Sequence, residues 1–291
     1  MELRTFGETG LSVSVLGLGA GQMGEGWVEE SDAAAVLNGA LDAGVTLIDT
    51  ARGYGLSEER IGRHLAHRRD EFVLSTKGGY DIEGTQDWTP ANVTGTLDRA
   101  LGLLRTDRID IFHLHSCPVE VLERGDLQDT LDAAVAAGKI RVAAYSGDND
   151  ALAYAAASGR FGSIETSVNL ADQWSLHDVL PLHSGLGVIA KRPIANAPWR
   201  FVERPVGHYA ELYWERLRAL ALDPAGLEWD EFAVRFSAYA PRVSSAIVGT
   251  SKLTNLQRNA TLVAKGPLPA DVLVAVEQAW QTTGADWPGS V

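Results

Sequence analysis

Short apolar runs rich in β-branched residues recur along the 291-residue chain, and each stops at polar, glycine or proline positions. Runs of this length between turn residues are typical of buried strands. The pattern predicts eight strands, at Val13–Leu18, Thr46–Asp49, Phe72–Lys77, Ile109–His115, Arg141–Ser146, Ser163–Asn169, Gly187–Pro193 and Ser244–Gly249.

Helical patterns lie between these runs and show helix-end residues. Pro90 stands where a helix would begin, Ser57 is a candidate cap, and Gly44 and Gly138 follow two helices as C′ residues. The predicted helices are Asp32–Ala43, one beginning at Ser57, Pro90–Leu104, Asp126–Ala137, Asn149–Ser158, Ser175–His183, Tyr209–Ala221, Glu228–Tyr239, Lys252–Val263 and Ala270–Gln281.

The alternation of strands and helices predicts a parallel sheet with right-handed crossovers. Eight such units fit a closed (β/α)8 TIM barrel, which typically takes ~250 residues. We therefore expect residues 1–291 to form a single α/β barrel domain with extra C-terminal helices. The first residues read as two short strands around Gly7–Gly10, and we expect this N-terminal β-hairpin to plug the barrel bottom. The longest irregular stretch is Ile194–His208.

Composition narrows the partners and the compartment. The formal net charge of -13 argues against nucleic acid or an anionic membrane, because both require a basic face. Cys117 is the only cysteine, so no internal disulfide can form, and a reducing compartment is expected. We find no signal peptide, no apolar run long enough to span a membrane and no metal-binding motif, and we expect a cytoplasmic protein.

Polar residues end or follow three consecutive strands. Asp49 ends T-L-I-D-T, Tyr54 follows in A-R-G-Y-G, Lys77 ends F-V-L-S-T-K, and His115 ends I-D-I-F-H-L-H. In a parallel barrel these positions meet at one rim, where such folds place their chemistry. A nearby ammonium stabilises a phenolate, and a carboxylate positions the ammonium. The four residues together suggest proton transfer to or from a substrate oxygen.

The segment Gly19–Gly24 follows a predicted strand and matches G-x-G-x-x-G. This match raises the alternative of a Rossmann dinucleotide site, with Asp49 as its ribose-binding acid. A Rossmann fingerprint opens its helix, whereas seven residues separate Gly24 from the helix expected at Asp32. We favour a glycine-rich loop that lets a ligand or another backbone approach closely, with Gly21 as a candidate cofactor contact.

The sequence resembles the aldo-keto reductase family along nearly its whole length. The matching stretches include L-I-D-T-A-R-G-Y-G-L-S-E-E-R-I-G, L-S-T-K-G-G, G-K-I-R-V-A-A-Y-S-G and A-I-V-G-T-S-K-L-T-N-L-Q-R-N. The resemblance implies a (β/α)8 barrel that binds NAD(P)H across its C-terminal rim. It also implies a catalytic tetrad of Asp49, Tyr54, Lys77 and His115, with Tyr54 as general acid.

The resemblance also implies cofactor contacts, some of them altered. Ser146 matches a serine that contacts the nicotinamide amide, Glu165 stands where the family usually has glutamine, and Lys191 or Arg192 replaces a stacking aromatic. The adenosine end is expected at Gly249, Ser251, Lys252, Asn255 and Asn259. Lys252 near a 2′-phosphate favours NADP(H) over NAD(H).

The predicted function is an NAD(P)(H)-dependent oxidoreductase that interconverts aldehydes or ketones and alcohols. One alternative is an NAD-dependent aldose or sugar dehydrogenase, and another is a non-catalytic NADP-binding regulatory barrel. Trp27 and Trp199 are candidate substrate contacts, because both fall on loops expected at the rim. Cys117 reads as a small buried thiol.

Overall fold

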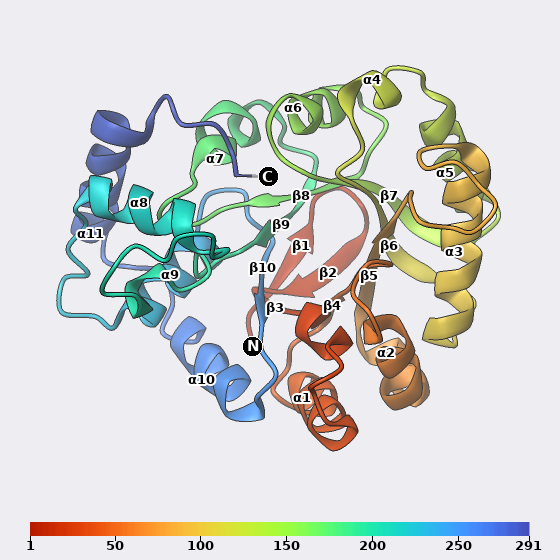
Figure 1. The fold of residues 1–291 in the computed structure, drawn as a ribbon, viewed down its shortest axis with the longest axis horizontal. Coiled ribbons are helices and arrows are strands. Elements are labelled where there is room, and N and C mark those ends of the chain that lie inside the picture. The colour runs from red at the N-terminus through yellow and green to blue at the C-terminus, as the bar shows by residue number, and fades with distance from the viewer. Residues whose placement is uncertain (291) are drawn as a thin grey trace.

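Eight parallel strands close into a barrel in the computed structural model, which describes residues 1–290, and helices surround it (Figure 1). Strands β3 to β10 pair in chain order, and β10 pairs with β3 to close the ring. The strands are β3 (Leu16–Gly19), β4 (Leu47–Asp49), β5 (Val73–Gly78), β6 (Ile109–His115), β7 (Ile140–Ser146), β8 (Ser163–Ser167), β9 (Gly187–Lys191) and β10 (Ser245–Gly249). The predicted (β/α)8 barrel is therefore confirmed, with strand ends within a few residues of those expected.

The helices follow the predicted order, with a few differences at their ends. They are α1 (Glu30–Asp42), α2 (Ser57–Leu65), α3 (Pro90–Leu104), α4 (Val119–Leu122), α5 (Asp126–Ala136), α6 (Asn149–Ala157), α7 (Trp174–Asp178), α8 (Glu211–Leu220), α9 (Trp229–Ala238), α10 (Leu253–Val263) and α11 (Ala270–Ala279). The four-residue α4 was not predicted. No helix within residues 1–290 is long and apolar enough to cross a membrane.

Two helix ends illustrate how local chemistry sets the boundaries. Pro90 is the first residue of α3, and the Thr89 side chain accepts a hydrogen bond from the Asn92 N–H, as a capping residue does. The expected cap at Ser57 is wrong. Ser57 is the first residue of α2, and its buried hydroxyl instead accepts from Thr50 and donates to the Ala20 carbonyl.

The N-terminal hairpin, β1 (Leu3–Phe6) and β2 (Leu11–Ser14), closes the bottom of the barrel as predicted. Phe6, Leu11 and Val13 are buried in one cluster with inward-facing side chains of the barrel strands. A Cβ on Gly187 would lie 2.4 Å from the Phe6 ring, so the ring fills the space that glycine leaves. The hairpin side chains therefore fill the end of the barrel opposite the C-terminal rim.

The glycine-rich segment after β3 does not open a Rossmann helix. It forms a short 3-10 helix, η1 (Ala20–Gly24), and α1 begins only at Glu30. The sheet is closed, so the crevice of an open doubly wound sheet is also missing. Gly24 instead lies directly against the backbone of Tyr54: a Cβ on Gly24 would be 1.7 Å from the Tyr54 carbonyl oxygen. The segment allows two backbones to meet, which is one of the roles expected for it.

Candidate active site

The C-terminal rim brings together the four residues predicted to act in proton transfer. Asp49 ends β4, Lys77 lies near the end of β5, and His115 ends β6. Tyr54 lies in the loop between β4 and α2, where its N–H donates to the Ala51 carbonyl at 3.0 Å. The Tyr54 and His115 rings are perpendicular, with centroids 6.0 Å apart. Their shared location follows from parallel strands that all end at one rim.

Lys77 is fully buried and is held by an ion pair behind the Tyr54 ring. Its Nζ lies 2.6 and 2.5 Å from the two carboxylate oxygens of Asp49, and it donates to the Thr50 carbonyl at 3.0 Å. The same nitrogen lies 5.6 Å from the centroid of the Tyr54 ring. A buried ammonium requires such compensation, and these bonds fix its position.

A second buried carboxylate, Glu165 on β8, joins this pair. Glu165 Oε2 lies 3.1 Å from Lys77 Nζ and 3.9 Å from His113 Nε2. Burial, then repulsion from Glu165, raises the pKa of Asp49, although Lys77 acts in the opposite direction. Burial alone would raise the pKa of Glu165, but Lys77 and His113 lower it. Asp49 and Glu165 thus share the one buried ammonium of Lys77, and each carboxylate disfavours the charge on the other.

The ionisation of Tyr54 reflects these competing charges. Lys77 lowers the pKa of the phenol, as expected from the sequence. Burial and the carboxylates of Asp49 and Glu165 raise it by more, and the resulting pKa is about 12. Tyr54 is therefore a protonated phenol at neutral pH.

His115 is also neutral. Burial and the nearby Lys77 ammonium lower the pKa of His115 to about 3. Its Nδ1 lies 2.9 Å from the hydroxyl of Tyr80, which belongs to the loop after β5. The half-buried imidazole therefore has one occupied nitrogen and one without a hydrogen-bond partner within residues 1–290.

A cavity of about 920 Å³ runs along this rim from Tyr54 to the start of α10. Asp49, Tyr54 and His115 line it, while Lys77 lies behind them. All ten residues predicted to contact a cofactor line it as well: Gly21, Ser146, Glu165, Lys191, Arg192, Gly249, Ser251, Lys252, Asn255 and Asn259. Residues from the two ends of the sequence thus share one elongated groove.

The two tryptophans predicted to contact substrate do not line this cavity. Trp27 is exposed on the surface. Trp199 stacks on Trp229 with ring centroids 5.8 Å apart, and its Nε1–H donates to Asp230 at 3.2 Å. Trp199 lines a separate cavity of about 290 Å³ beside α8 and α9. Cys117 is buried as expected, and burial raises the pKa of its thiol to about 12.

Some polar side chains of the groove already have hydrogen-bond or ion-pair partners within the protein, and others do not. The buried Ser146 hydroxyl has no hydrogen-bond partner within residues 1–290. Lys252 lies at the N-terminus of α10, and no carboxylate among residues 1–290 forms an ion pair with it. By contrast, Lys191 pairs with Asp148 at 2.9 Å, and Arg192 donates to the Ser290 carbonyl at 2.7 Å. Ser146 and Lys252 are thus available to a polar, anionic ligand.

The buried groups around Lys77 include three side chains of the kind that bind metals. Ligand atoms of Asp49, His113 and Glu165 all lie within 4.8 Å of one another. Lys77 Nζ lies 2.5 Å from Asp49 and 3.1 Å from Glu165, so its ammonium already supplies the positive charge at this point. The cluster is better described as a buried ion-pair network than as a metal centre.

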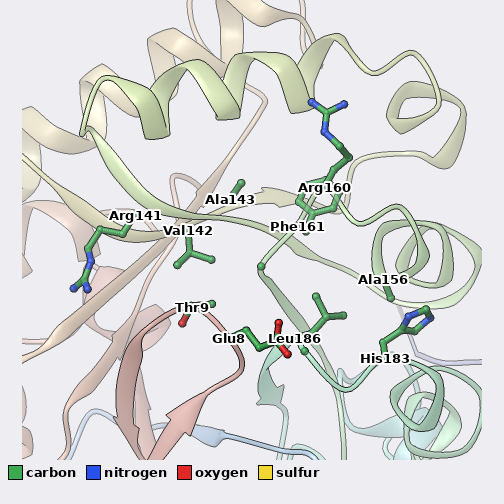
Figure 2. A pocket seen from close by; sticks show the side chains of 12 residues that line it. Glu8, Thr9, Arg141, Val142, Ala143, Ala156, Arg160, Phe161, His183 and Leu186 are labelled. Carbon is green, nitrogen blue, oxygen red and sulfur yellow. The ribbon is translucent and has the colours of Figure 1, made fainter.

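A different cavity, of about 470 Å³, lies at the hairpin end of the barrel (Figure 2). Its lining includes Glu8 in the hairpin turn, Arg141 at the start of β7, and Arg160. Both arginines are engaged elsewhere, Arg141 with Asp110 and Arg160 with carboxylates of α5. None of the predicted site residues lines this cavity, so it is not part of the candidate active site.

Several residues of the site were not assigned a role from the sequence. Tyr80 contacts His115, and Ser75 donates to Asp49 at 2.8 Å. His113 lies behind them, with its Nε2 3.1 Å from the Ser75 hydroxyl. A periodicity argument could have found His113, because positions 113 and 115 of a strand face the same side. Tyr80 lies in a loop, where no periodicity indicates the direction of a side chain.

Comparison with known proteins agrees with this geometry. The aldo/keto reductase family model matches residues 15–281. The chain is 29% identical to L-galactose dehydrogenase of Arabidopsis thaliana over 91% of its length and 89% of the relative. It is 28% identical to D-threo-aldose 1-dehydrogenase of a Pseudomonas species, over 93% and 95%.

Among solved structures, an aldo-keto reductase from Bacillus halodurans in its holo form has the same fold. It superposes with a TM-score of 0.82 at 23% identity, covering 98% of this chain and 97% of the other. From the family match over most of its length, the chain belongs to the aldo/keto reductase family and is an oxidoreductase of carbonyl and alcohol substrates.

Proposed function

We propose that the protein is an NAD(P)(H)-dependent reductase and dehydrogenase, in which Tyr54 transfers the proton between enzyme and substrate oxygen. The observation that carries the proposal is the buried Asp49–Lys77 pair behind a half-buried phenol at the end of a long groove. A bound nicotinamide cofactor would supply or accept the hydride.

The residues of this chain account for the proton half of the reaction. With a pKa of about 12, Tyr54 is protonated at neutral pH and suits the donor role towards a carbonyl oxygen. In the reverse direction the phenolate accepts the alcohol proton, and the Lys77 ammonium stabilises its charge. Asp49 holds Lys77 in place, and neutral His115 donates a hydrogen bond to the same oxygen.

The groove fits an elongated dinucleotide by its chemistry. The unpartnered Ser146 hydroxyl suits a carboxamide at the tetrad end, and Glu165 could accept the carboxamide N–H. At the other end, Lys252 and the first N–H groups of α10 suit a phosphate. Because Lys252 has no carboxylate partner within residues 1–290, we favour NADP(H) over NAD(H).

A mutation in the tetrad tests the catalytic role. Tyr54→Phe keeps the ring and should leave NADPH binding, followed by fluorescence titration, within about twofold. It should lower turnover by about 100-fold or more, since general acid catalysis contributes ~10²–10⁴. Tyr154→Phe on α6 is the matched control, because its hydroxyl makes no hydrogen bond within residues 1–290. Near-normal turnover in Tyr54→Phe would show that the role is wrongly assigned.

The same titration tests the cofactor preference. Lys252→Ala should weaken NADPH binding by about tenfold or more, because a charged hydrogen bond is worth ~1.5–3 kcal/mol, and it should change NADH binding much less. Equal losses for both cofactors would contradict a 2′-phosphate contact.

A second candidate is the oxidation of aldoses or related sugars with NAD. It is favoured by the names of two relatives, L-galactose dehydrogenase and D-threo-aldose 1-dehydrogenase, each aligned over about nine-tenths of this chain. Initial rates in both directions, with both cofactors and a panel of aldehydes and sugars, separate the two candidates. Lack of turnover with any of them, together with tight NADPH binding, would instead support a regulatory barrel.

A further inference from the structure

The loop after β5 places a second tyrosine against the imidazole of the candidate active site. The Tyr80 hydroxyl lies 2.9 Å from His115 Nδ1, and the two ring centroids are 5.7 Å apart. Trp88 packs edge-on against Tyr80, with ring centroids 5.9 Å apart. A Cβ on Gly53 would lie 2.8 Å from the Tyr80 hydroxyl, so the phenol is confined between Gly53 and His115. This arrangement leaves Tyr80 little freedom to turn away.

The contact has a chemical consequence because His115 is a neutral imidazole. A neutral imidazole carries one N–H donor and one bare acceptor nitrogen, and the partner of one nitrogen decides which is which. No other acceptor for the Tyr80 O–H is found within residues 1–290. A phenol O–H that donates to Nδ1 leaves the hydrogen of the ring on Nε2.

We infer that Tyr80 is a positioning residue: its hydroxyl holds His115 Nδ1 as an acceptor, so that Nε2–H is the donor presented to the substrate oxygen beside Tyr54. The role assigned to Nε2–H rests on the proposed function, whereas the tautomer itself rests on the 2.9 Å contact of Tyr80 with Nδ1 and on the phenol acting as its donor. In the opposite tautomer, the lone pair of Nε2 would face the carbonyl oxygen of the substrate. The lone pairs of that oxygen would repel it, and no hydrogen bond could form.

The tautomer can be measured directly on the full chain without cofactor or substrate. In histidine-¹⁵N-labelled protein, the long-range ¹H–¹⁵N spectrum distinguishes an Nε2–H imidazole from an Nδ1–H imidazole, and the signal of His115 is identified by its loss in His115→Asn. We expect the wild-type enzyme to show Nε2–H. Tyr80→Phe, which keeps the ring and its packing on Trp88, should show a mixture of tautomers or mainly Nδ1–H. Tyr154→Phe is the control and should leave the spectrum unchanged.

The kinetic counterpart is a fall in kcat of about tenfold in Tyr80→Phe, with the dissociation constant for NADPH unchanged. The expected fall in rate is smaller than the ~10²–10⁴-fold contribution of a complete acid–base group, because Tyr80→Phe weakens the His115 donor without removing it. The inference is overturned if wild-type His115 carries its hydrogen on Nδ1, or if Tyr80→Phe keeps the Nε2–H signal.

The two readouts also separate this inference from the proposed function. If Tyr54→Phe keeps full turnover while Tyr80→Phe shifts the His115 tautomer, the proposed proton transfer is wrong and the positioning of His115 stands. If Tyr54→Phe is inactive and the His115 tautomer does not depend on Tyr80, the proton transfer stands and the inference about Tyr80 is wrong.

Discussion

Because Gly24 lies against the backbone of Tyr54, we predict that adding a methyl group at Gly24 lowers the catalytic rate, although Gly24 itself has no side chain that could take part in the reaction. A Cβ on Gly24 would lie 1.7 Å from the Tyr54 carbonyl oxygen and 2.5 Å from its carbonyl carbon. On the Tyr54 side of this contact, a Cβ on Gly55, which has φ +48°, would lie 2.4 Å from the Gly24 oxygen. Neither segment has space for a methyl group.

The displacement caused by Gly24→Ala follows from these distances. Non-bonded heavy atoms are best separated by about 3.5–4.0 Å, so a contact of 1.7 Å forces the two segments apart by more than about 1 Å. A shift of about 1 Å in a catalytic group can cost ~100-fold in rate. Overpacking itself costs about 1–3 kcal/mol of stability, which a folded barrel can tolerate. We therefore expect Gly24→Ala to fold and to lose about 100-fold in kcat.

The assay compares kcat of Gly24→Ala with that of Gly26→Ala, using one good carbonyl substrate and saturating NADPH. A Cβ on Gly26 meets no atom within 4 Å, so this control should keep kcat within about twofold. Circular dichroism at the assay temperature shows whether each variant is folded. A folded Gly24→Ala enzyme with kcat within threefold of wild type would refute the reasoning.

Two further predictions concern the plug and the buried charge. Phe6→Ala should cost about 3–5 kcal/mol of unfolding free energy, because Phe6 is fully buried against the barrel strands, and a loss below about 1 kcal/mol in urea denaturation would contradict the plug. Glu165→Gln removes a buried negative charge that raises the pKa of Tyr54, so that pKa should fall. Alcohol oxidation needs the phenolate, so its rate should reach its plateau at lower pH than in the wild type; an unmoved profile would show that Glu165 does not act on Tyr54.

Local chemistry determined the fold and most of the candidate site. A strand or helix pattern depends on neighbours along the chain, so the eight strands and helix starts such as Pro90 could be predicted. The same logic placed Asp49, Lys77 and His115 at one rim, because parallel strands end on one side. Even the ten groove residues could be named, through their resemblance to a family.

Only the tertiary structure decided which side chains touch, because those contacts join residues far apart in sequence. Ser57 looks like a cap from its neighbours, yet its hydroxyl bonds to Thr50 and Ala20. Trp199 looks like a rim aromatic, yet it stacks on Trp229.

The charges at the site depend on the same long-range contacts. Burial and Glu165 raise the pKa of Tyr54 although Lys77 alone would lower it, and the sum depends on distances that no sequence pattern contains. The sequence by itself thus predicted which groups would take part in proton transfer and at which rim they lie. The packing of β4, β5, β6 and β8 determined how strongly each of those groups holds its proton, because burial and charge act through space and not along the chain.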